Sequence, residues 1–148
     1  MEKVSDLMSK GNIQTIEPGS DVEEAARRMK SSVKGCLVVV DNGRPIGMLT
    51  ERDIVHKIVA EGKSSSTRVA DAMTSPVVTI GPRESAAVAA RMMSAHQIRR
   101  LVVTEGGKAV GVITVTDLAR HVEHSGVTDY LKAVIGRGEL LETQEALM

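Results

Sequence analysis

The sequence predicts an α/β fold of the α+β type, made of two pseudo-symmetric β-α-β-β-α repeats that pack sheet to sheet. Three observations predict it. Sliding the chain by 64 residues matches 14 of 39 positions between 15 and 53 without a gap. Each copy holds one stretch with helical spacing of apolar residues, then two apolar runs joined by a glycine turn. A copy of about sixty residues buries little surface alone, so two copies are expected to share a core.

Each copy is expected to open with a short extended segment and a helix. The extended segments are Ile13–Ile16 and Val77–Ile80, each followed by a proline two residues later. In the first copy, Ser20-x-x-Glu23 is a capping-box pattern and predicts that the helix begins there. The residues expected on its buried face are Val22, Ala25, Ala26 and Met29.

A hairpin and a second helix are expected to follow. In the first copy the strands Cys36–Val40 and Pro45–Leu49 flank Asp41-Asn42-Gly43, which carries the Asn-Gly signal of a tight turn. A helix is predicted from Thr50 through Ile54, Val55, Ile58 and Val59. The second copy repeats this with Leu101–Thr104, Gly106-Gly107, Ala109–Ile113 and a helix from Thr114.

The polar segment Ala60–Arg68 contains glycine and three serines and reads as the linker between copies. The predicted division is therefore 1–62 for the first repeat, 63–125 for the second, and 126–148 for a partly helical tail with no counterpart in the first copy.

Composition excludes several classes of function. The chain has no Trp, no Phe and one Tyr, so base stacking on aromatic side chains is not expected. Nineteen basic and nineteen acidic residues cancel, which disfavours nucleic acid and anionic membranes as partners. The single cysteine, Cys36, lies in an apolar run and reads as a buried, inert thiol. No leader or membrane-spanning stretch is evident, so a cytoplasmic location is expected.

The strongest candidate site is a pattern that occurs twice. Gly47-x-x-Thr50-x-x-Asp53 and Gly111-x-x-Thr114-x-x-Asp117 each place a threonine and an aspartate where a strand ends and a helix begins. Backbone N–H groups face outward there, and a carboxylate can accept hydrogen bonds from ribose hydroxyls. The alternative is that Thr-x-x-Asp only caps its own helix. Recurrence of the glycine with both residues favours a ligand site.

Arginines add a second signal. Arg99 and Arg100 stand directly before the strand Leu101–Val103, where a guanidinium can bind phosphate in bidentate fashion. The alternatives are a solvated pair or an ion pair with an acidic residue. The first copy has Gly35 and Cys36 at these positions. His121 and His124 lie three apart, but no third metal ligand is evident, and no metal site is predicted.

Taken together, these motifs resemble a pair of cystathionine-β-synthase (CBS) domains, also called a Bateman module. The resemblance rests on Val-x-Asp-x-Met at 4–8 and 69–73, the Thr-Ile-x-Pro segments, the Leu-Val-Val strands and the two Gly-x-x-Thr-x-x-Asp ends, and it covers roughly residues 4 to 122.

The resemblance implies a regulatory module, not an enzyme, which needs no cofactor and binds AMP, ADP, ATP or S-adenosylmethionine in a cleft between the repeats. The second site is expected to be the better one, because Cys36 replaces the basic residue in the first. A homodimer through Ile54, Val55 and Ile58, or Leu118 and Val122, and a separate effector protein are also implied. The alternative is a dimeric scaffold with vestigial clefts. The implied binding residues are Thr114, Asp117, Arg100, Arg99, Thr50, Asp53, Met8, Ile13, Met73 and Val78.

Overall fold

The computed structural model describes residues 2–8, 13–32 and 35–120. The predicted tail 126–148, the pair His121 and His124, and Val122 lie outside the described residues. The described chain forms two compact units. We call residues 13–32, 35–78 and 104–110 the repeat-1 unit, and residues 2–8, 79–103 and 111–120 the repeat-2 unit.

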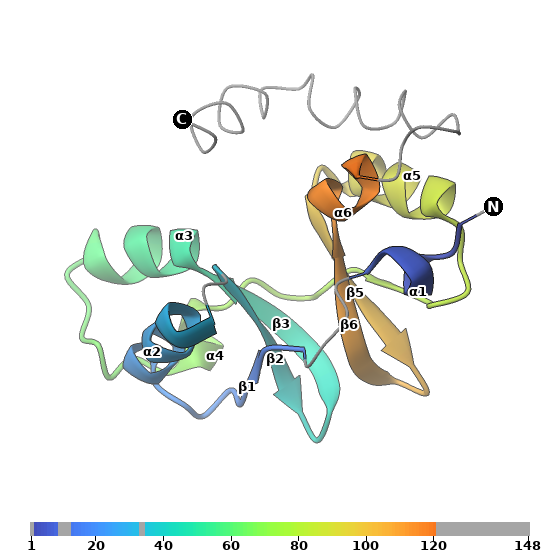
Figure 1. The fold of residues 1–148 in the computed structure, drawn as a ribbon. Helices are drawn as coiled ribbons and strands as arrows, with labels where there is room; N and C mark the ends of the chain where they lie inside the picture. Colours follow the sequence, from blue (N-terminus) through green and yellow to red (C-terminus); the bar gives the residue numbers. More distant parts are fainter. Residues whose placement is uncertain (1, 9–12, 33–34, 121–148) are drawn as a thin grey trace. The chain divides into compact units, whose positions relative to one another are not determined.

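The sheet of the first repeat has the strand order β1-β2-β3 (Figure 1). Strand β1 (Thr15–Ile16) runs parallel to β2 (Cys36–Asp41), and β2 runs antiparallel to β3 (Arg44–Thr50). Parallel neighbours need a crossover connection, and α2 (Val22–Ser32) supplies it. The predicted β-α-β-β order is therefore confirmed, although β1 is shorter than the predicted extended segment.

The two hairpin turns adopt the conformation that their sequences predict. Asn42 has φ 53° and Gly43 has φ 81°, so both central residues of the first turn are left-handed. Gly106 and Gly107 have φ 60° and 78° in the second turn. Positive φ at both central residues defines the type I′ turn, whose twist matches that of the flanking strands.

The cap of α2 differs from the prediction by one residue. The Asp21 carboxylate, not the Ser20 hydroxyl, accepts the backbone N–H of Glu24, at 2.9 Å. The sequence carries two overlapping cap patterns, Ser20-x-x-Glu23 and Asp21-x-x-Glu24, and the helix beginning at Val22 uses the second. The predicted buried face was also wrong at Ala26, which is exposed.

The core of the repeat-1 unit lies where α2, η1 and α4 pack on the sheet. The π-helix η1 (Ile54–Val59) follows the short helix α3 (Glu51–Asp53), and α4 (Val69–Ala72) follows the linker. Every side chain of the core cluster is at most 4% exposed. The cluster comprises Ile16, Val22, Ala25, Met29, Leu37, Val39, Leu49, Ile58, Val69 and Ala72.

The helix predicted after Thr50 exists, but its second part is a π-helix. The N–H of Ala60 donates to the carbonyl of Val55 at 2.9 Å, an i→i+5 bond. Ile58 points into the core at 4% exposure, whereas Val55 and Val59 are 55% and 69% exposed.

The second repeat has the strand order β4-β5-β6, with α5 as the crossover and α6 after β6 (Figure 1). Strand β4 is parallel to β5. Ser85 caps α5 by accepting the N–H of Val88 at 3.2 Å. His96 ends α5 and is exposed. The elements are β4 (Thr79–Ile80), α5 (Ala86–His96), β5 (Arg100–Glu105), β6 (Lys108–Thr114) and α6 (Val115–Ala119).

The two Val-x-Asp-x-Met motifs form short helices that the sequence analysis did not predict. Helix α1 (Val4–Leu7) lies in the repeat-2 unit, where the N–H of Val4 donates to the carbonyl of Glu84 at 2.8 Å. Helix α4 lies in the repeat-1 unit. The compact units therefore exchange these motifs relative to their order along the chain. No helix among the described residues is long and apolar enough to cross a membrane.

Candidate ligand site

A methionine packs against the glycine of each Gly-x-x-Thr-x-x-Asp motif. A Cβ at Gly47 would come within 2.5 Å of the sulfur of Met73, and one at Gly111 within 2.6 Å of the sulfur of Met8. Both distances are shorter than real Cβ contacts, so a side chain at either position would force the methionine to move. Each glycine thus lets the end of a short helix, α4 or α1, close onto the strand that leads to the threonine.

The threonine and aspartate of each motif form a complete capping box. In the first copy, Thr50 Oγ1 accepts the N–H of Asp53 at 3.1 Å, and Asp53 Oδ2 accepts the N–H of Thr50 at 2.9 Å. In the second copy, Thr114 and Asp117 make the same two bonds at the same distances. The capping role is therefore present in both copies. Whether a ligand also binds depends on the acceptor positions that remain.

Those remaining positions differ between the copies. The other carboxylate oxygen of Asp53, Oδ1, receives Lys57 Nζ at 3.1 Å and Thr74 Oγ1 at 3.3 Å. Asp117 Oδ1 has no donor among the described residues. Asp53 and Asp117 are both buried, with 9% and 6% exposure. Burying a carboxylate oxygen without a hydrogen-bond partner costs free energy. A ligand that donates a hydrogen bond to Asp117 Oδ1 would remove this cost.

The backbone of Arg99 lies beside the start of α6, which the Thr114 cap begins. The carbonyl of Arg99 accepts the N–H of Val115, the first residue of α6, at 3.0 Å. Both arginines are half-buried. Within residues 2–8, 13–32 and 35–120, neither guanidinium has an ion pair or a hydrogen bond, so the predicted alternative of an ion pair is not observed there. The second copy therefore has two half-buried arginines without an acidic partner among the described residues, and the backbone of one of them, Arg99, joins the start of α6.

In the first copy an acidic side chain, Glu51, lies over Gly35, the residue equivalent to Arg99. The carbonyl of Gly35 accepts the N–H of Glu51 at 2.9 Å, which repeats the Arg99–Val115 bond. The Glu51 carboxylate lies over Gly35, 3.3 Å from where a Cβ would stand. Cys36, which replaces Arg100, is half-buried and not the buried thiol that the apolar run predicted. Cys36 is the first residue of β2 and pairs with Thr50, the last residue of β3, and its partial exposure follows from that place at the end of the strand.

The methionines and the residues before the first strands are divided between the units. Met73 and Val78 belong to the repeat-1 unit with Thr50 and Asp53, and both are half-buried. Met8 belongs to the repeat-2 unit, with Thr114 and Asp117.

Ile13 precedes β1 in the repeat-1 unit, whereas Met8 lies in the repeat-2 unit. Sequence reasoning missed Lys57 and Thr74. The i,i+4 spacing of Asp53 and Lys57 is a signal that could have found the first, whereas nothing in the spacing points to the second.

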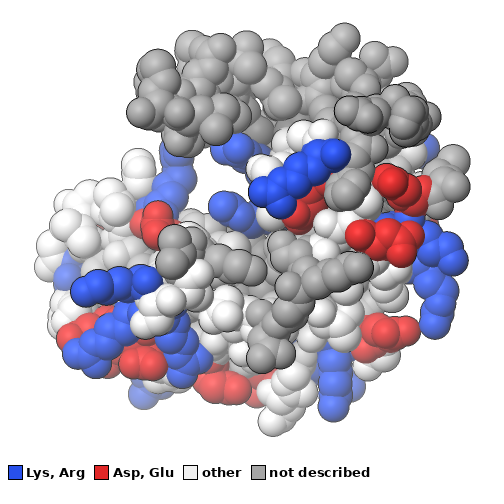
Figure 2. All heavy atoms as spheres, in the orientation of Figure 1, with Lys and Arg blue, Asp and Glu red and all other residues white. Residues whose placement is uncertain are grey.

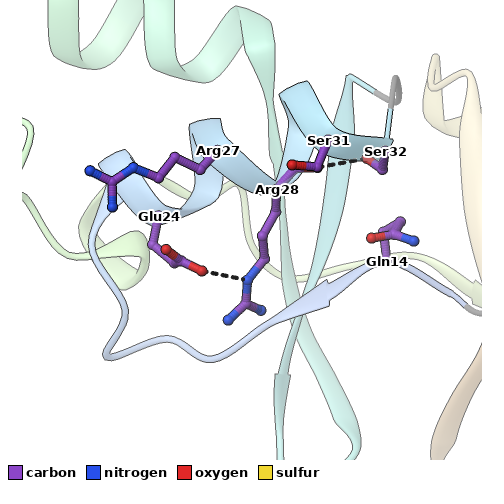
Figure 3. A pocket seen from close by; sticks show the side chains of 6 residues that line it. All are labelled: Gln14, Glu24, Arg27, Arg28, Ser31 and Ser32. Carbon is purple, nitrogen blue, oxygen red and sulfur yellow. Dashed lines mark hydrogen bonds and ion pairs between the residues drawn. The ribbon is translucent and has the colours of Figure 1, made fainter.

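A separate open pocket of about 470 Å³ lies along α2 (Figure 3). Its arginines are engaged with neighbours on the same helix, because Arg27 pairs with Glu23 at 2.7 Å and Arg28 with Glu24 at 3.1 Å. Arg28 also donates to the carbonyl of Thr15 at 2.8 Å. The pocket therefore offers no open cationic group. Its lining is Gln14, Glu24, Arg27, Arg28, Ser31 and Ser32.

On the face in view, both basic and acidic side chains are exposed among uncharged ones (Figure 2). In the described part of the chain, no group of three or more His, Cys, Asp or Glu residues could hold a metal ion.

Comparison with known proteins identifies the family. The CBS domain model matches residues 4–60 and 69–124. The CBS domain-containing protein YhcV of Bacillus subtilis is 36% identical over 119 residues, which cover 80% of this chain and 84% of YhcV.

Solved structures agree in fold. A putative signal-transduction protein with CBS domains from Burkholderia ambifaria superimposes with a TM-score of 0.74 at 32% identity, covering 82% of this chain and 94% of that one. A CBS domain protein of Pyrobaculum aerophilum, complexed with AMP, gives a TM-score of 0.74 at 25% identity and covers 88% of this chain and 98% of its own. Two matched domains, the same α+β architecture and a relative above 30% identity lead to one conclusion: this chain is a tandem pair of CBS domains and belongs to the CBS domain family.

Proposed function

We propose that the chain is a non-enzymatic regulatory module that binds an adenosine-type nucleotide at the Thr114 site, defined as Thr114, Asp117, Arg99 and Arg100. One observation carries the proposal: the buried Asp117 carboxylate keeps an oxygen without a donor among the described residues. Arg99 and Arg100 support it, because both are half-buried, have no acidic partner among the described residues, and Arg99 bonds through its carbonyl to the start of α6. CBS pairs are regulatory modules, many of which bind adenosine ligands, and the similar Pyrobaculum protein was solved with AMP.

The chemistry of the site matches the two polar parts of a nucleotide. Ribose carries neighbouring hydroxyls, and the free Asp117 oxygen accepts them without disturbing the cap bond that Oδ2 makes with Thr114 N–H at 2.9 Å. A phosphate fits the guanidinium groups of Arg99 and Arg100, which present paired donors. The ligand class with both features is a nucleoside phosphate, and we choose AMP as the first ligand to test. S-adenosylmethionine lacks the phosphate and makes less use of the arginines.

The first test is calorimetric titration with AMP, ADP, ATP and S-adenosylmethionine. Asp117→Ala should weaken AMP binding by roughly ten- to a hundredfold, the value of one or two hydrogen bonds to a charged group. Arg100→Ala should weaken AMP but not S-adenosylmethionine. Asp71→Ala is the matched control, because Asp71 is an exposed aspartate of α4 in the other unit. Equal AMP affinity in Asp117→Ala and the parent would refute the assignment.

A spectrum of the freshly purified protein precedes that titration. The chain has no Trp and one Tyr, so it absorbs weakly near 280 nm and a retained purine dominates near 260 nm. If no adenosine compound is retained and none binds on titration, the alternative function, a dimeric scaffold with vestigial sites, replaces the sensor.

We further propose that two chains associate through the exposed side chains of η1. The predicted dimer face needs correction, because Ile58 and Leu118 are 4% and 1% exposed and belong to the core. Val55 and Val59, one turn apart on η1, are the exposed large hydrophobic residues that remain on this helix. Light scattering after gel filtration should give a dimer for the parent and a monomer for the double variant Val55→Glu, Val59→Glu.

The functional division proposed here keeps 1–62 and 63–125 as the two repeats and 126–148 as a tail. Regulation then requires a separate effector protein, which co-purification with and without AMP tests.

A further inference from the structure

The ammonium group of Lys57 is fully engaged inside the Thr50 site, which we define as Thr50, Asp53, Lys57 and Thr74. Its nitrogen lies 3.1 Å from Asp53 Oδ1, 3.0 Å from the carbonyl oxygen of Ala72 and 3.3 Å from Thr74 Oγ1. A lysine has three N–H donors, and these are three acceptors. The side chain is therefore held from two places, the end of α3 and the end of α4.

The Asp53 carboxylate is saturated by these bonds. Oδ2 accepts the N–H and the hydroxyl of Thr50 at 2.9 and 3.1 Å, and Oδ1 accepts Lys57 and Thr74. An ionised carboxylate offers about four acceptor positions, so none is left for a ribose hydroxyl. The Asp53 side chain is 12% exposed, and the Lys57 side chain that contacts it is 42% exposed.

The phosphate side of the same site is unfavourable as well. Glu51 lies over Gly35, at the position where the second copy has Arg99. A nucleotide entering here would meet a carboxylate where the Thr114 site offers guanidinium groups, and like charges in contact disfavour binding. Both polar parts of a nucleotide are thus opposed in the first copy by its own side chains.

We propose that Lys57 is a specificity-determining residue that occupies the place of the ribose hydroxyls at Asp53 and so restricts the chain to one nucleotide. The inference deepens the proposed function, on which it rests. Lys57 lies on η1, four residues after Asp53, and it reaches both the Asp53 carboxylate and the carbonyl of Ala72 at the end of α4. In the second copy, position 121 is His instead of Lys.

The test uses adenosine, which has the ribose but no phosphate for Glu51 to repel. All variants carry Asp117→Ala, so that the Thr114 site is disabled and only the Thr50 site is read. By calorimetry or saturation-transfer NMR, the Asp117→Ala protein should bind no adenosine. Adding Lys57→Ala should create one site, at least about tenfold tighter than any residual binding, since one charge-assisted hydrogen bond is regained. Adding Asp53→Ala to that protein should abolish the site.

Matched variants separate this effect from a loss of charge or of fold. Lys63→Ala removes an exposed lysine of the same unit and should create no site. Lys57→Met keeps the aliphatic stem while removing the donors, and it replaces Lys57→Ala if circular dichroism shows that the alanine variant is unfolded.

The two proposals fail in different comparisons. The inference is overturned if the Asp117→Ala protein binds adenosine and the added Asp53→Ala change abolishes that binding. It is also overturned if a folded protein with a Lys57 substitution binds adenosine no better than the Asp117→Ala protein. The proposed function is overturned if the parent, with Asp117 intact, binds no adenosine compound. A parent without binding combined with a Lys57 variant that binds would support the inference and reject the Thr114 site.

Discussion

The two equivalent glycines give a sharp prediction, because the atoms opposing a new methyl group differ. At Gly47 a Cβ would lie 2.5 Å from the sulfur of Met73 and 3.1 Å from the backbone oxygen of Thr74. At Gly111 the atoms in the way all belong to the Met8 side chain, whose sulfur lies at 2.6 Å. A methionine side chain can turn aside, whereas a backbone carbonyl cannot move alone.

The backbone at Thr74 is fixed by a pair of hydrogen bonds. Its N–H donates to the carbonyl of Met48, and its carbonyl accepts the N–H of Met48, both at 2.9 Å. A methyl group at position 47 therefore presses on this bridge. Overpacking of this kind costs about 1–3 kcal/mol, and the smaller entropy of an unfolded alanine offsets about 0.4–1 kcal/mol. We expect Gly47→Ala to destabilise by about 1–2 kcal/mol and Gly111→Ala by less than about 1 kcal/mol.

Urea unfolding followed by circular dichroism gives the free energy of unfolding of each variant, which is compared with that of the parent. The melting temperature of Gly47→Ala should fall by roughly 2–8 °C, from about 2–4 °C per kcal/mol for a chain of this length. Gly47→Ala should also loosen the contact between Thr74 and Asp53, which NMR of the Thr74 amide reports. Equal destabilisation by the two alanines would refute the reasoning, since it would mean that the backbone carbonyl adds nothing to the clash.

Three further predictions concern the cap, the core and the charge of the site. Asp21→Ala should lower the free energy of unfolding by about 1 kcal/mol, because the Asp21 side chain caps α2. Ser20→Ala should change it very little, and a larger loss in the Ser20 variant than in the Asp21 variant would show that Ser20 is the cap. Leu49→Ala, at a fully buried position, should cost about 2–5 kcal/mol in the same assay, and a loss below 1 kcal/mol would mean that the core around β3 is loosely packed. AMP affinity should fall as salt rises from 50 to 500 mM, because phosphate binding by two arginines is screened; adenosine affinity in the same titration should stay nearly constant.

Local signals in the sequence predicted most of the fold. The Asn42-Gly43 turn and the Thr-x-x-Asp boxes depend on neighbours within four residues, and both form as predicted. The short helices α1 and α4 escaped prediction because four residues are too few for a periodicity to show. The cap of α2 was misplaced because two cap patterns overlap by one residue, and the choice depends on where the helix meets the core.

The candidate site was predicted only in its local part. The spacing of Thr114 and Asp117 offered their capping contact as the alternative to a ligand site, and the structure contains that contact. The bond from the Arg99 carbonyl to the start of α6 was not predicted from the spacing. The sequence did not predict that the Asp53 carboxylate is fully bonded while the Asp117 carboxylate is not. The contacts of Lys57 with Ala72 and Thr74 join residues 15 and 17 positions apart in the sequence, and local spacing does not predict such contacts. Such contacts depend on how α4 returns to the sheet, and that return is a property of the packed core.

The place of α1 has a consequence for synthesis on the ribosome. The N–H of Val4 donates to the carbonyl of Glu84, and the N–H of Ala86 donates to the carbonyl of Glu2, so α1 leaves the exit tunnel before its partners, which follow about eighty residues later. At roughly 5–20 residues per second, α1 waits about 4–16 s before they are made. We therefore expect nascent chains stalled before residue 79 to hold α1 unstructured, while the segment from β1 to α4 can already collapse, and a tag at the N-terminus to disturb the unit that carries Asp117 and not the one nearest in sequence.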